Sequence, residues 1–446
     1  MGLSHGVLRK YPSLVALGIF LGAVALFAAL LSTPVAAADG RPTALHDAVF
    51  TAVSATTVTG LVAVDTAEHW SFFGQVVILA GIQVGGLGIV TIALLLSRAV
   101  THRLGVRSRV FAQQGIGTER LGEVQSLLKV VVVTTFAVEL ALAAVLVPSF
   151  VVREGSFLQG LWHGVFYAVS SFNNAGFVTH AGGLAPFADD PTIIVPIMVG
   201  VFVGSLGFPV FLVLLAHRWH VRRWNLHAKL TVTVTTGLLL VGALAWTLLE
   251  WSHSPTIGGM TVGEKIVHGL FASTMMRSGG FELVDTGASH PITLLVTDAL
   301  MFVGGGSAST AGGIKVTTIA LLFLAIAAEG KGDKSVRVFR RTVPEAALRV
   351  AISVLFLGAS LVLVATALVM TVSDAPLDRI LFEVISAFAT CGLSVGLSEQ
   401  LPPFGKYVLA ALMFAGRIGP IGLASALAVR RRSLLYNYPE DRPVIG

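Results

Sequence analysis

The phrase SATTVTGL occupies residues 54–61, and three variants of it follow: SSFNNAGF at 170–177, MMRSGGF at 275–281 and SAFATCGL at 386–393. Each phrase ends in a glycine followed by a bulky apolar residue. The glycines are Gly60, Gly176, Gly280 and Gly392, at spacings of 116, 104 and 112 residues. A single glycine of this kind indicates only a helix C-cap. Four glycines at matched places indicate a fourfold internal repeat.

The chain around these phrases is strongly apolar. Hydrophobic residues make up 54% of its 446 residues and charged residues only 12%, against about 25% in soluble domains. This composition predicts an integral membrane protein and excludes a soluble enzyme, a coiled coil and a disordered chain. The one cysteine, Cys391, excludes an intrachain disulfide and a thiolate metal cage.

Eight apolar runs are long enough, at roughly 18 residues or more, to cross a bilayer. They lie near residues 13–31, 72–96, 126–148, 192–216, 231–249, 292–328, 346–371 and 407–429. The first run resembles a signal peptide, but its apolar stretch exceeds the roughly 7–15 residues of a signal sequence. Each odd run is followed by a shorter apolar stretch, at 45–58, 157–172, 266–276 and 380–389. Such lengths suit half-helices that enter the membrane without crossing it.

Basic residues indicate the orientation. The formal net charge is +6, and most Lys and Arg lie before the first run or after the second, fourth, sixth and eighth. The positive-inside rule then places both termini in the cytoplasm. The expected fold is an all-α polytopic membrane protein with eight transmembrane helices. They form four parallel repeats (span, pore half-helix, span) around a central pore, at residues 1–98, 99–220, 221–342 and 343–446, the last with a cytoplasmic C-terminal tail.

A fourfold repeat of half-helices favours ion conduction. Glycine adopts backbone conformations closed to other residues, so four loops around one axis can turn carbonyl oxygens inward and replace the water shell of an ion. The half-helices point their negative dipole ends at the same centre, which favours a cation. A coupled transporter is the alternative, but many transporters carry inverted repeats, and all four copies here run in the same direction. A membrane enzyme is disfavoured because no acids or histidines cluster at one interface.

Three further motifs carry a family resemblance. GGSASTAGGIK at 305–315 is similar to the pattern GGSPGSTAGGIK, with its Pro-Gly pair replaced at Ala308. MFAGRIGP at 413–420 resembles a last span with a pore-facing arginine, and YPEDRPVIG at 438–446 resembles a family tail. Over essentially its whole length the chain resembles the potassium-translocating subunits of the Ktr/Trk/HKT superfamily, and most of all the KtrB-type subunits.

The resemblance implies that backbone carbonyls at and before the four glycines form an ion-selectivity filter, the one place where potassium binds. The implied filter residues are Val58, Thr59 and Gly60; Asn174, Ala175 and Gly176; Ser278, Gly279 and Gly280; and Thr390, Cys391 and Gly392. Four glycines resemble potassium-selective members, whereas sodium-preferring HKT relatives often have serine in the first copy. Each of these four groups of three residues, called an arm below, lacks the second glycine of a TVGYG loop. Selectivity is therefore expected to be looser than in a tetrameric potassium channel.

The resemblance also implies an intramembrane gate loop at residues 304–314. Its residues are Gly304, Gly305, Gly306, Ser307, Ala308, Ser309, Thr310, Ala311, Gly312 and Gly313. A continuous helix is not expected there, because each glycine costs about 1 kcal/mol relative to alanine. Close helix packing through small residues is the alternative. The segment is not a nucleotide-binding P-loop, because Ile314 separates Gly313 from Lys315.

Charged residues near these segments have two interpretations each. Arg417 is implied to face the pore as a barrier to ions, and Lys315 to lie beside the gate loop; either cation could instead satisfy helix-end carbonyls. Glu282 is either a cation-attracting carboxylate at the outer mouth or a solvated loop charge. Arg277 is expected to satisfy carbonyls at the end of its own half-helix. Asp298 and Glu139 have no role that the sequence assigns, and Cys391 is expected to be a small packing residue.

The function expected from the resemblance is gated, selective potassium uptake across the bacterial plasma membrane, without an enzymatic reaction and without a cofactor in this chain. The resemblance implies a homodimer and a separate cytoplasmic RCK-type regulatory ring (KtrA-like) that binds the nucleotide. A dependence on sodium is left open. A related conductor of sodium or ammonium remains the alternative.

Overall fold

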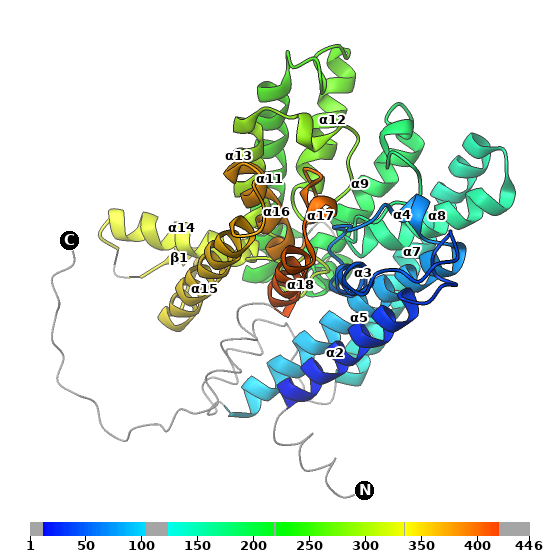
Figure 1. Ribbon diagram of the computed structural model, residues 1–446. Helices are drawn as coiled ribbons and strands as arrows, with labels where there is room; N and C mark the ends of the chain where they lie inside the picture. The colour runs from blue at the N-terminus through cyan, green and yellow to red at the C-terminus, as the bar shows by residue number, and fades with distance from the viewer. Residues whose placement is uncertain (1–11, 104–123, 218–219, 334, 419–446) are drawn as a thin grey trace, which may run out of the picture.

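The computed structural model describes residues 12–103, 124–217, 220–333 and 335–418, and this part of the chain is almost entirely helical (Figure 1). A long helix, a short helix and a further apolar segment follow one another four times. The first two sets are α2 (Pro12–Leu31), α3 (Leu45–Thr57) and α5 (Phe72–Arg103), then α7 (Val124–Glu154), α8 (Phe157–Phe172) and the pair α9 (Pro191–Leu206) and α10 (Phe208–His217). The other two are α11 (Leu226–Glu250), α12 (Val262–Met275) and the pair α13 (Pro291–Phe302) and α14 (Val316–Gly330), then α15 (Glu345–Met370), α16 (Leu377–Ala389) and α18 (Pro403–Ile418).

Short elements connect these helices. They are the single turns α4 (Thr66–His69) and α17 (Leu397–Gln400) and the 3₁₀ turns η1 (Ala185–Phe187), η2 (Val221–Arg223) and η3 (Thr286–Ala288). An antiparallel hairpin, β1 (Arg337–Val338) with β2 (Arg341–Thr342), departs from the predicted all-α fold. Its two turn residues, Phe339 and Arg340, have φ values of 47° and 63°, and this left-handed turn matches the twist of paired strands.

Apolar helices long enough to span a membrane are present. Helices α11, α15 and residues Val131–Glu154 of α7 meet that criterion by length and composition, and the α9–α10 pair meets it together although it bends by 100°. The apolar run near residues 192–216 is therefore not one straight helix, because the chain turns at Gly207, whose φ is 91°. The sixth run is interrupted between Phe302 and Val316. The predicted break in that run is therefore confirmed. Part of the predicted last span and the tail lie outside the described residues.

The four short helices coincide with the four short apolar stretches. Helix α8 has the predicted bounds, and α3 and α16 differ from the prediction by one to three residues at an end. Helix α12 begins four residues earlier than expected, because Thr261 and Glu264 form a capping box in which the Thr261 N–H donates to the Glu264 carboxylate at 2.7 Å. Each of these helices thus ends within one of the glycine phrases, three to five residues before its glycine.

The four sets close a ring of helix contacts. Helix α5 packs against α8, α9 against α12, α13 against α16, and α18 against α3. The last contact joins the two ends of the chain, and Figure 1 shows α18 beside α3. It carries a largely buried ion pair, in which Nζ of Lys406 lies 2.6 Å from Oδ1 of Asp47. The ring brings the C-terminal ends of the short helices toward one region.

Candidate functional site

Each short helix is followed, within three residues, by a residue in a left-handed backbone conformation. Two residues before each glycine the chain has a positive φ, 54° at Val58, 59° at Asn174, 94° at Ser278 and 47° at Thr390. The glycines follow with φ values of 92° at Gly60, 68° at Gly176, 72° at Gly280 and 94° at Gly392. A positive φ is rare for residues with a side chain, so the four repetitions give the four arms a common shape.

The four arms meet around one centre. A Cβ atom added to Gly60 or to Gly392 would collide with the carbonyl oxygen of Ala175 or of Thr59, respectively. A Cβ on Gly280 would lie 2.7 Å from the carbonyl oxygen of Cys391. A Cβ on Gly176 would lie 3.1 Å from the carbonyl oxygen of Gly279.

Each glycine therefore faces the carbonyl that precedes the next glycine, in chain order, and the fourth faces the first. All the predicted filter residues are brought together, and the side chains of the non-glycine members are buried. Since every contact is made against backbone, no larger residue fits at these four places without moving an arm.

The same backbone hydrogen bond is present in three of the four arms. Thr59, Ala175 and Cys391 each donate their N–H to the carbonyl five residues earlier, at 2.8, 2.7 and 2.9 Å. In the first and fourth arms the glycine N–H also donates to a serine hydroxyl, Ser54 and Ser386, at 3.1 Å in both cases. These bonds fix where the carbonyls point.

The third arm differs from the others. Gly279 donates to the carbonyl of Met275, four residues back, at 2.8 Å. The Ser278 hydroxyl donates to the Thr390 carbonyl at 2.9 Å, which ties the third arm to the fourth. The Cys391 thiol, fully buried, donates to the Met275 carbonyl at 3.3 Å. The ring is thus fourfold in outline but asymmetric in detail.

The glycine-rich segment between α13 and α14 packs against two of the arms. Thr310 Oγ1 donates to Oδ1 of Asn174 at 2.8 Å in the second arm. A Cβ on Gly312 would lie 3.0 Å from the Ala389 carbonyl oxygen, beside the fourth arm. The N–H of Phe208 donates to the Ala308 carbonyl at 3.2 Å, so the segment also supports the bend between α9 and α10.

Three buried or nearly buried cations donate to carbonyls of this segment. The Arg417 guanidinium donates through Nη1 to the Thr310 carbonyl, while its Nε and Nη2 have no hydrogen-bond partner in the described part of the chain. Lys315 donates through Nζ to the Ala311 carbonyl at 2.5 Å. Both cations therefore lie at the predicted gate loop.

Arg277 is the third cation, and its predicted contacts were wrong. It donates to the carbonyls of Thr235 at 2.8 Å and Gly304 at 3.4 Å. The side chain extends away from its own helix, because the carbonyls at the start of the glycine-rich segment and in α11 lie within its reach. Arg277 thus links α11 to the segment that carries Thr310.

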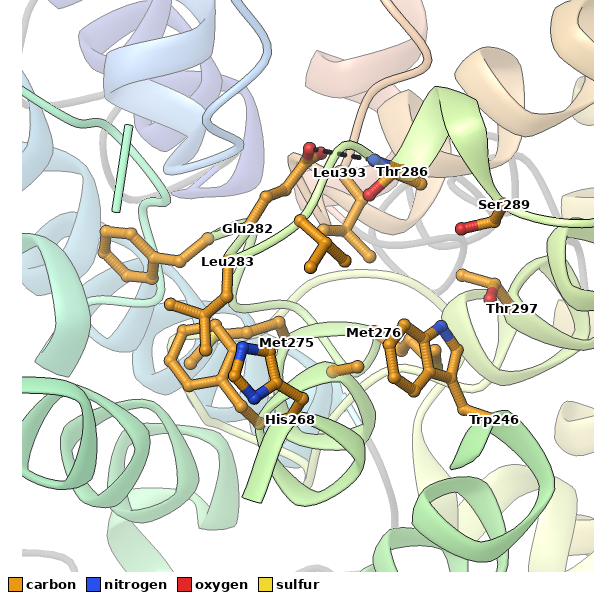
Figure 2. Close-up of a pocket in the computed structure, with 14 residues that line it drawn as sticks. Trp246, His268, Met275, Met276, Glu282, Leu283, Thr286, Ser289, Thr297 and Leu393 are labelled. Atoms are coloured by element: carbon orange, nitrogen blue, oxygen red, sulfur yellow. Dashed lines mark hydrogen bonds between the residues drawn. The ribbon is translucent and has the colours of Figure 1, made fainter. Parts of the chain in front are cut away.

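Glu282 is held between the third and fourth arms. Its carboxylate accepts the N–H of Ser394 at 3.1 Å and of Thr286 at 3.5 Å. Figure 2 shows it pointing toward Thr286 at one end of a mostly apolar cavity, away from His268 and Met275. Burial raises the pKa of Glu282 to about 7. Backbone N–H groups therefore supply partners for this carboxylate, which does not fit the alternative of a solvated loop charge.

Two residues that were not predicted from the sequence stabilise the chain that follows the arms. Glu383, fully buried in α16, accepts the N–H of Val395 at 3.2 Å and of Ser398 at 3.0 Å. Tyr167 of α8 accepts the N–H of Thr179 at 3.3 Å. Both lie nine residues before the glycine of their arm, and this shared offset is the signal that could have found them.

Of the two acids without an assigned role, Glu139 now has one. Its carboxylate accepts from the side-chain amides of Asn173 at 2.8 Å and Gln83 at 3.2 Å, so it holds the base of the second arm. Asp298 is buried in α13, and no interaction in the described residues explains it.

A profile of a known family matches residues 24–433 of the chain, and it is that of TrkH, described as a cation transport protein. The chain belongs to the TrkH family of cation transport proteins. The resemblance inferred from the motifs is therefore confirmed, as is the expectation of a transport protein in place of an enzyme.

Curated relatives match over almost the full length. The chain is 34% identical to the Ktr system potassium uptake protein B of Bacillus subtilis, covering 98% of this chain and 96% of the relative. It is 35% identical to the protein of the same name from Vibrio alginolyticus, with coverage of 96% and 93%. It is 34% identical to the potassium/sodium uptake protein NtpJ of Enterococcus hirae, with coverage of 97% and 96%.

A solved structure shares the fold. The potassium transporter TrkH from Vibrio parahaemolyticus superposes with a TM-score of 0.73 at 19% identity, covering 92% of this chain and 84% of that one. The chain is thus a multi-pass membrane protein with the TrkH fold.

Proposed function

We propose that this chain is the potassium-translocating subunit of a Ktr-type uptake system and admits potassium by gated, selective conduction. The observation that carries the proposal is the ring in which each of four glycines faces the carbonyl that precedes the next. Carbonyls in such a ring replace the water shell of a cation. The names of two nearly full-length relatives, potassium uptake proteins of the Ktr system, support the choice of ion.

The proposed filter consists of the four arms. The carbonyls of Thr59, Ala175, Gly279 and Cys391 form its narrowest layer, and those of the residues on either side of them, Val58 and Gly60, Asn174 and Gly176, Ser278 and Gly280, Thr390 and Gly392, complete it. The Ser278 hydroxyl already uses one lone pair of the Thr390 carbonyl, so this oxygen has less electron density to offer an ion. The layers are therefore unequal, which favours fewer strong sites than a symmetric filter has.

The proposed gate is the segment Gly304–Gly313. Its bond to Asn174 through Thr310 and its contact beside Ala389, in two of the four arms, support this assignment. Arg417 and Lys315 hold its carbonyls in this position. The buried guanidinium also opposes the passage of a cation, because charges in a poorly solvated region interact strongly. Opening requires the segment to leave both arms.

The remaining parts of the proposal concern arrangement and partners. The four repeats at 1–98, 99–220, 221–342 and 343–446 give eight membrane crossings around one pore, with both termini in the cytoplasm of a bacterial cell. Two such chains form a homodimer, and an RCK-type ring carries the nucleotide and faces the basic loops. The transported ion binds at the filter, and the nucleotide is held by the partner ring and not by this chain.

A second candidate function is conduction of sodium as well as potassium. Gly279 favours it, because an additional glycine loosens the third arm where the Gly279 carbonyl faces Gly176. The name of the relative NtpJ, a potassium/sodium uptake protein, points the same way. Sodium would then either permeate the filter or promote the opening of the gate.

The test is cation flux into liposomes that contain the purified chain, under an inside-negative potential worth about 2.3 kcal/mol per charge per 100 mV. Potassium, rubidium, sodium and ammonium are compared for the wild type, Gly60→Ser and Gly237→Ser. Gly237 lies in α11 with no neighbouring atom within 4 Å of an added Cβ, so it is the matched control. Potassium uptake that exceeds sodium uptake, and a preference weakened by Gly60→Ser alone, supports the proposal. Equal effects of the two substitutions would remove the filter assignment.

A further inference from the structure

Three side chains from separate parts of the second repeat converge outside the filter. Glu154 is the last residue of α7, His163 lies in α8, and His180 follows Gly176 by four residues. Oε1 of Glu154 lies 2.7 Å from Nδ1 of His163 and 3.1 Å from Nε2 of His180. One ligand atom from each residue lies within 4.8 Å of the other two. In the described residues this is the one such group of three.

The two histidine nitrogens both contact the same oxygen of the Glu154 carboxylate, so the two carboxylate oxygens differ in their hydrogen bonding. Oε2 of Glu154 is buried and has no hydrogen-bond partner among the described residues, whereas Oε1 serves both rings. A carboxylate with one crowded and one unpaired oxygen is poorly satisfied by protein alone, since buried polar atoms normally have partners. A cation between the three side chains would be coordinated by the carboxylate and would give the unpaired oxygen, Oε2, an electrostatic partner.

The surroundings suit a metal ion. The three side chains are 13–17% exposed, so an ion can reach them but most water is excluded. The ring of Phe150 stacks on the His180 ring at a centroid separation of 5.6 Å, and Phe187 meets it edge-on at 4.7 Å. An apolar shell of this kind controls solvent access and the local dielectric around a metal.

The second nitrogen of His180 already has the partner that a metal ligand needs. Nδ1 lies 2.9 Å from the hydroxyl of Tyr167, and that hydroxyl is itself held by the N–H of Thr179. A histidine that binds a metal through one nitrogen almost always donates from the other. Tyr167 can accept from Nδ1, which leaves the Nε2 lone pair directed at the carboxylate.

We propose that Glu154, His163 and His180 form a binding site for a divalent transition-metal ion of the zinc type. Two imidazoles and one carboxylate are ligands for Zn²⁺, with a water molecule as the fourth ligand. Calcium and magnesium are poorer candidates, because they favour oxygen ligands. Zinc–ligand distances of about 2.0–2.2 Å place tetrahedral donor atoms roughly 3.4 Å apart. The Glu154–His163 separation of 2.7 Å therefore needs to open by about 0.7 Å, and the Glu154–His180 separation of 3.1 Å by about 0.3 Å.

The place of the site gives it an effect on transport, and this step rests on the proposed function. A bound ion fastens His180, and with it the chain that leaves the second arm, to α7 and α8. Because His180 lies only four residues after Gly176, the ion restricts that arm. Zinc on the side of the membrane where these residues lie therefore lowers potassium flux.

Metal binding is measured without any transport. The full chain, purified with a tag that contains no histidine and freed of metal with a chelator, is titrated with zinc by isothermal titration calorimetry. One zinc per chain is expected for the wild type, with affinity at least about tenfold weaker in the double variant His163→Gln/His180→Gln. His290→Gln is the matched control: this histidine precedes α13, its ring lies 3.7 Å from the His253 ring between centroids, and in the described residues it belongs to no group of three possible metal ligands.

The outcomes separate the two proposals. Equal zinc affinity in the wild type and the double variant overturns the site, and so does a loss of affinity in His290→Gln. Glu154→Gln, which keeps the size of the side chain, gives a second measurement should the double variant fail to fold. Zinc that binds the wild type and leaves potassium flux unchanged overturns the link to the filter. Flux that is absent with and without zinc counts against the proposed function and not against the site.

Discussion

Replacement of Arg417 by glutamine is expected to raise potassium flux. Arg417 is 6% exposed, and its guanidinium donates to the carbonyl of Thr310. The hydroxyl of Thr310 in turn donates to Asn174 in the second arm. A hydrogen bond from a charged donor contributes about 1.5–3 kcal/mol. In the proposed mechanism this bond exists while the gate segment lies against the arms, so its loss favours opening by up to that amount. Since every 1.4 kcal/mol is a factor of ten, the expected increase in open population is roughly 10- to 150-fold.

The assay is potassium flux into liposomes at a fixed potential. Arg417→Lys keeps the charge but loses the planar fork of donors, so its flux is expected between those of the wild type and Arg417→Gln. Arg349→Gln is the matched control, because the Arg349 side chain is 80% exposed and lies 3.5 Å from Glu345 in a solvent-exposed ion pair. A folded Arg417→Gln protein whose flux equals that of the wild type, or falls below it, would refute the role of this bond in closing the gate.

Three further results are expected. Burial raises the pKa of Glu282 to about 7, so the carboxylate becomes charged as the pH rises through that value. Because a charged carboxylate attracts cations, potassium flux is expected to increase between about pH 6 and pH 8 in the wild type. The Glu282→Gln variant is expected to lack that increase. Gly392→Ala is expected to abolish potassium selectivity, because the added Cβ meets the first arm, whereas Gly237→Ala leaves selectivity unchanged in the same flux assay. Lys406→Met is expected to destabilise the chain by up to about 3–5 kcal/mol in detergent unfolding, because it removes the ammonium group beside the largely buried Asp47 carboxylate and leaves His46 at 3.5 Å. Recovery of stability in the double variant Lys406→Met/Asp47→Leu would confirm the cause, and a single variant as stable as the wild type would contradict it.

The short helices and the glycine phrases could be predicted from sequence because each is local. An apolar stretch of fixed length ending in glycine carries its own signal, and α8 begins and ends where the stretch does. The break in the sixth run was predictable for the same reason, since Gly304–Gly313 is unsuited to a helix.

The bend at Gly207 could not be predicted, because its cause is distant in sequence. The apolar run continues across it, and the turn is supported by Ala308, which accepts the N–H of Phe208. Glu383 and Tyr167 were missed because a single polar residue in an apolar helix gives no periodic pattern. The contacts of Arg277 were predicted wrongly, because the carbonyls of Thr235 and Gly304 are distant in sequence and come close to its side chain only in the folded chain.

The central claim is that a cation binds where the four glycines meet. A crystal structure of the chain grown in rubidium, with anomalous diffraction recorded at the rubidium edge, tests it directly. The account predicts an anomalous peak within coordination distance of the carbonyl oxygens of Thr59, Ala175, Gly279 and Cys391. A ring without a peak, in a crystal that shows rubidium bound elsewhere along the chain, would contradict it.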